Sequence, residues 1–251
     1  GIRAVLAGSQ AQFSVEYPCD APHQPRWVTL TVLPLQQARP GVVVIHQDVT
    51  ARKRAEAALQ ARLRLSHFAE THTLAELLQR TLDEAEVLTG SQIGFFHFLE
   101  ADQQTLSLQM WSTNTLQTMC TAEGMGQHYP VGEAGVWVDC IAARQPVIHN
   151  DYDSLPHRKG MPAGHAPVKR ELVAPVIRND IIVAILGIGN KVAPYNDQDA
   201  RDLLSLADLA WDVVLRKRTE DALRANRDYL QAVLDSASDA IFVDDADTGQ
   251  T

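Results

Sequence analysis

The chain has 251 residues, of which 45% are hydrophobic and 21% charged, and 31 acidic residues against 22 Lys and Arg give a formal net charge of −9. This balance is typical of globular domains and excludes a wholly disordered or collagen-like chain. An acidic chain lacks the basic surface that nucleic-acid binding requires, so we expect no nucleic-acid partner. No apolar run approaches the roughly 20 residues that span a bilayer, and three cysteines indicate reduced thiols. We therefore expect a cytoplasmic segment without membrane contact.

The N-terminal residues predict a small antiparallel sheet. Residues 13–17, 27–33 and 42–45 are runs with alternating or β-branched side chains, bounded by Pro and Gly. Such runs are typical of strands joined by turns. Asp48 and Thr50 then stand where the first residues of a following helix need a capping side chain.

A repeated helical segment follows this sheet and recurs near the end of the chain. The sequence RKRAEAAL at residues 52–59 reappears as RKRTEDAL at residues 216–223, and both copies are rich in strong helix formers. After the second copy, four residues follow the 3-4-3 spacing of a coiled-coil seam: Leu223, Asn226, Leu230 and Val233. We expect helical linkers and a homodimer through them, with an amphipathic helix packed on its own domain as the alternative.

Both ends of the chain resemble parts of a PAS sensory domain. The sequences EYPC at residues 16–19, RW at 26–27 and HQDVTARKRAE at 46–56 are similar to its closing strands and exit helix. Residues 229–249, with LDSASDAIFVD, resemble its entry helix and first strand. The resemblance implies four parts in all. These are the C-terminal part of a PAS-like domain at 1–50, a helical linker at 51–66, a complete sensor domain at 67–214, and a linker with the start of a second PAS-like domain at 215–251.

The central block reads as one α+β domain. Apolar residues recur at helical spacing from residue 74 to residue 85, and Gly90 ends that helix. A second long helix, at residues 197–216, closes the block. Between them the pattern predicts a short helix at 134–143 and several strands, which are residues 93–99, 106–111, 146–149, 170–177 and 181–188. This order implies an antiparallel sheet with its helices on one face.

The same block resembles a GAF domain. The matching motifs, in order, are GEAGV at 132–136, QPVI at 145–148, LVAPVI at 172–177, IVAILGIGNK at 182–191 and YNDQD at 195–199. The resemblance implies a six-stranded sheet with a ligand cavity under the loops on the face away from the long helices. It leaves the ligand open, because the family binds several chemically different small molecules.

Polar and aromatic residues gather in the loops where such a cavity would lie. Aromatic faces with convergent His, Asn and Arg side chains suit a small planar or anionic ligand. The candidates are Trp111, Asn114, Cys120, His128, Tyr129, Trp137, Cys140, His149, Asp151, Tyr152, His165 and Arg170. The alternatives are surface or loop histidines with satisfied hydrogen bonds, ordinary core tryptophans, and a buried Cys140 that acts as a small hydrophobe.

Four sharper hypotheses concern single motifs. Asn190 and Lys191, followed by Tyr195 and Asp199, resemble the motif of cyclic-nucleotide-binding GAF domains, yet a structural ion pair between Lys191 and Asp199 is the favoured interpretation. No Cys-x-x-Cys or His-x-x-x-His spacing supports a metal, so none is expected. A redox pair of thiols lacks the cysteine spacing of GAF-type methionine sulfoxide reductases. No bilin is expected either, because neither cysteine of the block precedes a histidine.

Motifs for hydrolysis or phosphoryl transfer are absent from the sequence. The expected function is therefore a sensory segment of a bacterial cytoplasmic signalling protein. An unidentified small molecule would bind the GAF-like block, and dimeric helices would relay this to a histidine kinase or a diguanylate cyclase elsewhere in the protein. The alternatives are a thiol-dependent reductase and a purely structural dimerisation module.

Overall fold

The computed structural model describes residues 1–20, 26–35, 41–119, 128–159 and 167–236. The chain divides into two compact units, Gly1–Ala210 and Trp211–Thr251, which are described separately. No helix in the described residues combines the length and the apolar character that crossing a membrane requires.

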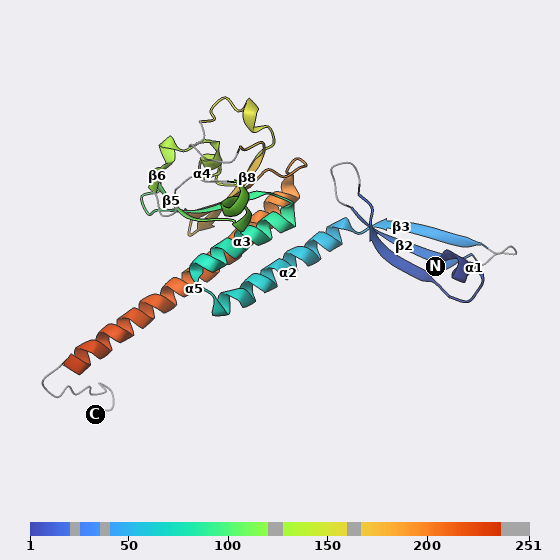
Figure 1. Cartoon of the computed structure of the whole chain (residues 1–251), viewed down its shortest axis with the longest axis horizontal. Helices are drawn as coiled ribbons and strands as arrows, with labels where there is room; N and C mark the ends of the chain where they lie inside the picture. Colours follow the sequence, from blue (N-terminus) through green and yellow to red (C-terminus); the bar gives the residue numbers. More distant parts are fainter. Residues whose placement is uncertain (21–25, 36–40, 120–127, 160–166, 237–251) are drawn as a thin grey trace. The chain divides into compact units, whose positions relative to one another are not determined.

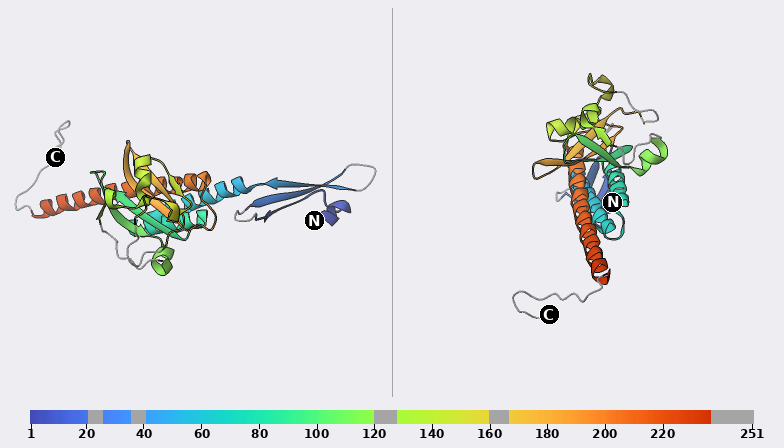
Figure 2. Two further views of the ribbon diagram at one scale, coloured as in Figure 1. Left: turned by 90° about the horizontal axis from the view of Figure 1, so that it is seen from above. Right: turned by 90° about the vertical axis from the view of Figure 1, so that its left-hand side faces the viewer.

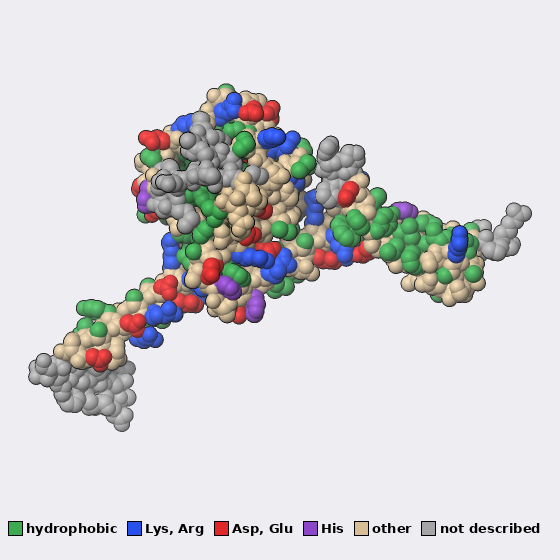
Figure 3. Space-filling model, in the orientation of Figure 1, with side chains coloured by type: hydrophobic (Ala, Val, Ile, Leu, Met, Phe, Trp, Pro, Cys, Tyr) green, Lys and Arg blue, Asp and Glu red, His purple; other side chains and the backbone are tan. Residues whose placement is uncertain are grey.

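The first unit begins with a short helix, α1 (Ile2–Leu6), and a three-stranded sheet. Its strands β1 (Phe13–Pro18), β2 (Trp27–Pro34) and β3 (Val42–Asp48) pair antiparallel in the order β1-β2-β3, which confirms the three predicted strands. Val5 of α1 and Val32 of β2 are buried, yet Val44 and Ile45 of β3 stay 40% and 45% exposed. A hydrophobic patch on this sheet is visible in Figure 3. That the sheet belongs to a PAS domain stays a prediction.

Two antiparallel helices follow, α2 (Thr50–Thr71) and α3 (Leu74–Thr89) (Figure 1). Thr73 and Glu76 form a capping box at the start of α3, and Gly90 ends it with a left-handed backbone, as the sequence predicts. The buried carboxylate of Glu84 accepts hydrogen bonds from Arg64 of α2 and from Arg80 of α3. This charged cluster joins the two helices side by side.

The centre of the first unit is a six-stranded antiparallel sheet. Its strands are β4 (Ile93–Leu99), β5 (Thr105–Trp111), β6 (His128–Pro130), β7 (Val147–His149), β8 (Glu171–Arg178) and β9 (Ile181–Gly189), in the spatial order β6-β5-β4-β9-β8-β7. The tight turn between β8 and β9 places Asn179 and Asp180 at positive φ, as an Asn-Asp hairpin turn allows. The six strands and this hairpin agree with the expected GAF-like sheet.

The two faces of this sheet carry different helices. On one face, Gly94 of β4 lies against Leu82 of α3, and a Cβ added at Gly94 would stand 3.4 Å from it. Phe95 points to the opposite face, because neighbouring strand residues alternate, and its ring contacts Trp137. Trp137 belongs to a short 3₁₀ helix, Val136–Val138, that leads into α4 (Asp139–Ala143). The sequence pattern predicts the helices on one face of the sheet. This holds for α3 but not for α4, which lies on the other side of the sheet in Figure 1.

The last helix, α5 (Asp197–Ser236), is longer than predicted and includes the second repeated segment without a break (Figure 2). Within the first unit, Leu203, Leu206 and Ala207 of α5 are buried. Arg178 at the end of β8 donates to both the carboxylate and the carbonyl of Asp208. In the second unit the four predicted seam residues are all exposed, so the helix presents an uncovered apolar stripe.

The elements that the sequence analysis does not predict include α1 and two short segments near β5. One is edge strand β6, which begins at His128, where the sequence pattern predicts a loop. The other is a π-helical turn, Thr115–Met119, directly after β5. Both are too short for side-chain periodicity to reveal them, and β6 also depends on its pairing with β5.

Candidate functional site

An aromatic cluster lies on the face of the sheet away from α3. The ring of Phe95 meets Trp137 edge-on at 5.7 Å and Trp111 at 6.3 Å between centroids. His97 lies under Trp137 at 4.8 Å, and its complete burial lowers its pKa to about 3, so its imidazole is neutral. Trp111, Phe95 and Trp137 are each partly exposed. A planar or apolar molecule would find ring faces and edges here.

A network of histidines and carboxylates lies beside this cluster, at the start of α4 and on edge strand β7. His149 Nδ1 stands 2.8 Å from Glu171 Oε1 of β8, and His149 Nε2 stands 3.2 Å from Asp139 Oδ2, the first residue of α4. The same Asp139 oxygen is 2.8 Å from His157 Nε2 in the following loop. We call these four residues the histidine–carboxylate network.

The electrostatics of the network favour a charged imidazole at its centre. The hydrogen bond with Glu171 raises the pKa of His149, burial opposes this, and the negative charges of Glu171 and Asp139 raise it further. Glu171 and His149 are well shielded, with side chains 5% and 11% exposed, whereas Asp139 is 31% exposed. Asp139 is therefore the more accessible of the two carboxylates, and His157, which is 55% exposed, is the most exposed member of the network.

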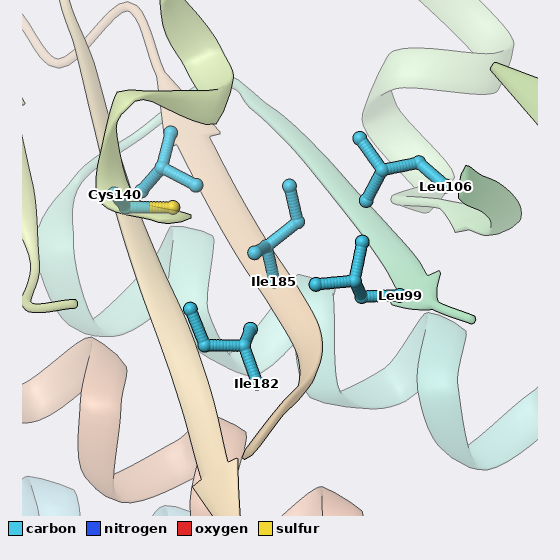
Figure 4. Packing of buried hydrophobic residues seen from close by; sticks show 6 residues of the cluster. Leu99, Leu106, Cys140, Ile182 and Ile185 are labelled. Carbon is cyan, nitrogen blue, oxygen red and sulfur yellow. The ribbon is translucent and has the colours of Figure 1, made fainter. Parts of the chain in front are cut away.

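Cys140 follows Asp139 but points into the core. Its side chain is fully buried with Ile185, Val173 and Ile182 (Figure 4). Burial raises the pKa of this thiol strongly, and the charges of Glu171 and Asp139 raise it further. A thiol beside two carboxylates is held in its neutral form, which is a poor nucleophile.

A second set of contacts connects the network to the start of α5. Asn150, next to His149, donates from Nδ2 to the carbonyl of Tyr195, and its Oδ1 accepts the amide N–H of Tyr195. The Tyr195 hydroxyl pairs with Ser91 at 2.7 Å. Lys191 Nζ lies 2.6 Å from Asp199 Oδ2 in the first turn of α5, the arrangement that the sequence analysis favours for these two residues. Edge strand β7 is therefore tied by side chains both to α4 and to α5.

The structure brings only some of the predicted site residues together. Trp111, Trp137, Cys140, His149 and Tyr152 lie on or next to the network and the aromatic cluster. Tyr152 is buried beside Gly135, and burial raises its pKa to about 12.

Other candidates are placed elsewhere or are occupied by local contacts. His128 and Tyr129 belong to β6, the sheet edge opposite β7, and four strands separate the two edges, so their convergence with His149 stays a prediction. Asn114 donates to the carbonyl of Gln92, and Arg170 donates to the carbonyls of Lys191 and Val192. Exposed Asp151 precedes a 3₁₀ turn, Tyr152–Ser154. Cys120 and His165 lie outside the described residues.

Sequence reasoning missed five residues of this region: Phe95, His97, Asp139, His157 and Glu171. A signal existed for three of them. The two-residue period of β4 and β8 places Phe95 and His97 on one face of the sheet and Glu171 on the same face as Val173. A charged residue such as Glu171 on an otherwise apolar, buried sheet face needs a polar partner, so its position indicates a functional or structural role. Nothing local marked Asp139 or His157, because their meeting depends on how α4 and the loop fold back.

The described residues hold no group of three or more His, Cys, Asp and Glu side chains that could bind a metal ion. In the network the imidazoles and carboxylates instead face one another at hydrogen-bond distance. The contacts within the network are therefore hydrogen bonds between imidazole and carboxylate groups.

Residues 71–214 match the family model of the GAF domain, so the chain belongs to the GAF domain family. A relative described as "Methyl sulfide methyltransferase-associated sensor", from Methanosarcina acetivorans, is 34% identical over 210 residues. The alignment covers 77% of this chain and 21% of that relative, so the chain spans about a fifth of its length.

Solved structures share the fold. The GAF domain of a phosphoenolpyruvate-protein phosphotransferase from Coxiella burnetii superposes with a TM-score of 0.55 at 16% identity, covering 67% of this chain and 98% of that one. A free methionine-R-sulfoxide reductase from Neisseria meningitidis gives 0.52 at 17% identity, covering 66% and 91%. At these identities the likeness concerns the fold alone. Fold and family together define a GAF domain.

Proposed function

We propose that this chain is the sensory segment of a larger cytoplasmic signalling protein, and that its GAF domain binds a small molecule between the aromatic cluster and the histidine–carboxylate network. The observation that carries the proposal is the pair of partly exposed rings of Phe95 and Trp137, 5.7 Å apart between centroids, with Asp139 of the network two residues after Trp137. Ring faces beside a few polar groups are typical of ligand sites. The relative from Methanosarcina acetivorans is described as a sensor, which supports the same role.

The ligand signal would leave the domain through α5. Asn150 holds the backbone of Tyr195, two residues before α5 begins, and Asn150 directly follows His149 of the network. A ligand that binds more tightly to one position of β7 would therefore also favour one position of the start of α5. The size of this shift is set by the difference in the ligand's affinity for the two states. A histidine kinase or a diguanylate cyclase in the whole protein is the proposed receiver, with PAS-like segments on either side of the GAF domain in a bacterial protein.

A thermal-shift screen of small aromatic and nitrogenous compounds tests ligand binding. A true ligand at 100 times its Kd stabilises the folded chain by about 2.7 kcal/mol, a melting-temperature rise of several degrees. Trp137→Leu and His149→Gln should abolish the rise, whereas Leu63→Gln on the exposed side of α2 should retain it. Failure of every compound to stabilise the wild-type chain, or equal stabilisation of all the variants, would contradict the proposed site.

The exposed seam of α5 should make the chain a dimer. Leu223, Leu230 and Val233 are 69%, 52% and 44% exposed, and a helix with such a stripe gains most by pairing with a second copy. Leu230→Glu places like charges across this seam and should convert the dimer to a monomer in sedimentation equilibrium. Gln231→Glu adds the same charge one residue away and serves as the control. A wild-type monomer at tens of micromolar would contradict the dimer.

The thiol-dependent reductase is the rival function, because one structural neighbour is such an enzyme. The buried, neutral thiol of Cys140 opposes it, and exposed Cys19 belongs to the N-terminal sheet. Methionine sulfoxide turnover that is lost in Cys120→Ser or Cys140→Ser would favour the reductase. The purely structural module would instead be favoured by a dimer that no compound stabilises.

A further inference from the structure

The two nitrogens of His149 face two different carboxylates. Nδ1 lies 2.8 Å from Glu171 on β8, and Nε2 lies 3.2 Å from Asp139 on α4. A neutral imidazole carries one N–H and can donate to only one of these groups, which leaves a lone pair facing the other carboxylate. The imidazolium form donates to both. The geometry is therefore complete only when the ring is protonated.

This ring connects three elements that otherwise have few links. Among the described residues β7, an edge strand of three residues, pairs only with β8, and α4 is a five-residue helix of about one and a half turns. His149 bridges β7 to β8 through Glu171 and to α4 through Asp139. Asp139 also accepts His157, so the loop after Tyr152 is attached to the same point. Removal of one proton weakens the whole junction.

We infer that His149 is a proton-operated latch that holds α4 and the 155–159 loop against the β7–β8 edge of the sheet. In the closed state the imidazolium bridges Asp139 and Glu171. Loss of its proton breaks the bridge to Asp139, the more exposed carboxylate, and frees the start of α4 together with neighbouring Trp137. Closure in response to pH would then control access to the aromatic cluster. That consequence rests on the proposed function, whereas the latch itself does not depend on it.

The charged and titratable groups around His149 come from every element packed on it. They are Asp139 and Cys140 of α4, Glu171 of β8, Tyr152 of the 3₁₀ turn and His157 of the loop. Cys140 and Tyr152 stay neutral near pH 7, because burial raises the pKa of each well above that range. His149, His157 and the two carboxylates therefore decide the charge of the latch.

The direction of the pH effect follows from the raised pKa of His149. A group whose pKa is higher in the folded chain stabilises that state fully below its unfolded value, here 6.5. The stabilisation disappears as pH rises through the folded pKa. The latch is thus closed below pH 6.5 and opens as the pH rises through the raised pKa of His149 in the folded chain. Buried Glu86, whose pKa burial raises to about 7, also loses stabilising protonation in this range, so a global melting curve would mix the two groups.

The test is a residue-specific NMR titration of the whole chain combined with amide hydrogen exchange. Nitrogen chemical shifts should show both His149 nitrogens protonated at low pH and a pKa above its value in the urea-unfolded chain. Exchange protection of α4 amides, corrected for intrinsic rates, should fall as His149 loses its proton. Each unit of pKa elevation corresponds to about a tenfold change in that protection.

The variants separate the latch from general stability. Asp139→Asn should lower the pKa of His149 and flatten the exchange profile of α4, while His67→Gln, which removes an exposed histidine of α2, should change neither. A His149 that titrates at or below its unfolded value, or α4 protection that is constant across its titration, would overturn the latch. Neither readout requires a ligand. The latch can therefore be disproved while ligand binding is retained, and ligand binding can be disproved while the latch is retained.

Discussion

Replacing Asp199 by Asn is expected to lower the free energy of unfolding by about 3 kcal/mol, because it leaves a buried ammonium without its counter-charge. The side chains of Lys191 and Asp199 are only 11% and 5% exposed, and Nζ contacts both carboxylate oxygens at 2.8 and 2.6 Å. Asp199 also accepts the backbone N–H of Asn196, which fixes the first turn of α5. Urea denaturation monitored by circular dichroism measures the loss.

The double-mutant cycle with Lys191→Met shows whether the effect belongs to the pair. Lys191→Met alone leaves the carboxylate unpaired and should cost a similar amount, whereas the double variant Lys191→Met/Asp199→Asn should cost clearly less than the sum of the single changes. Asp197→Asn, an exposed acidic residue of the same helical turn, is the control and should cost under about 1 kcal/mol. Strictly additive losses would show that the two charges do not interact.

Replacing Gly187 by Ala is expected to destabilise the domain by about 1–3 kcal/mol, because the new methyl group overlaps an aromatic ring. A Cβ at Gly187 would stand 2.1 Å from Cζ of Phe95, closer than atoms can approach. Phe95 has little freedom to move, since its ring already meets Trp111, Trp137 and His97. Thermal or urea unfolding measures the loss, and tryptophan fluorescence should shift as the cluster rearranges.

The compensating variant is Phe95→Leu, which shortens the side chain over Gly187. In that background Gly187→Ala should cost less than it does in the wild-type chain, because the overlap is relieved. Gly132→Ala is the control, since no atom lies within 4 Å of its added Cβ. An equal cost of Gly187→Ala in both backgrounds would place its effect in the backbone and not in the ring contact.

Much of the fold could be predicted from local patterns. The helix that ends at Gly90, the hairpin at Asn179 and Asp180, and the three N-terminal strands follow from residues close together in the chain, where propensity and turn chemistry act. Strand β6 and the turn Thr115–Met119 could not be predicted this way, because both are too short for a side-chain period and β6 depends on pairing with β5.

The candidate site was harder to predict than the fold. His149 and Trp137 were identified because polar and aromatic residues gather where the GAF resemblance implies a cavity, yet His128 was grouped with them although it lies on the opposite edge of the sheet. The position of a loop along the chain does not determine where it lies in the sheet. In the strand order β6-β5-β4-β9-β8-β7, the strands β6 and β7 are consecutive in sequence but lie at opposite edges.

Composition and charge, the starting observations, determined that the chain is acidic and has enough apolar residues for a packed core, and its ordered motifs supplied the resemblance to a GAF domain. Tertiary structure alone decided which side chains act together. It placed two carboxylates on the two nitrogens of His149, buried the Cys140 thiol beside them, and set Phe95 over Gly187. Sheet register and the return of α4 produce these contacts, and both arise from long-range packing that no local sequence pattern encodes.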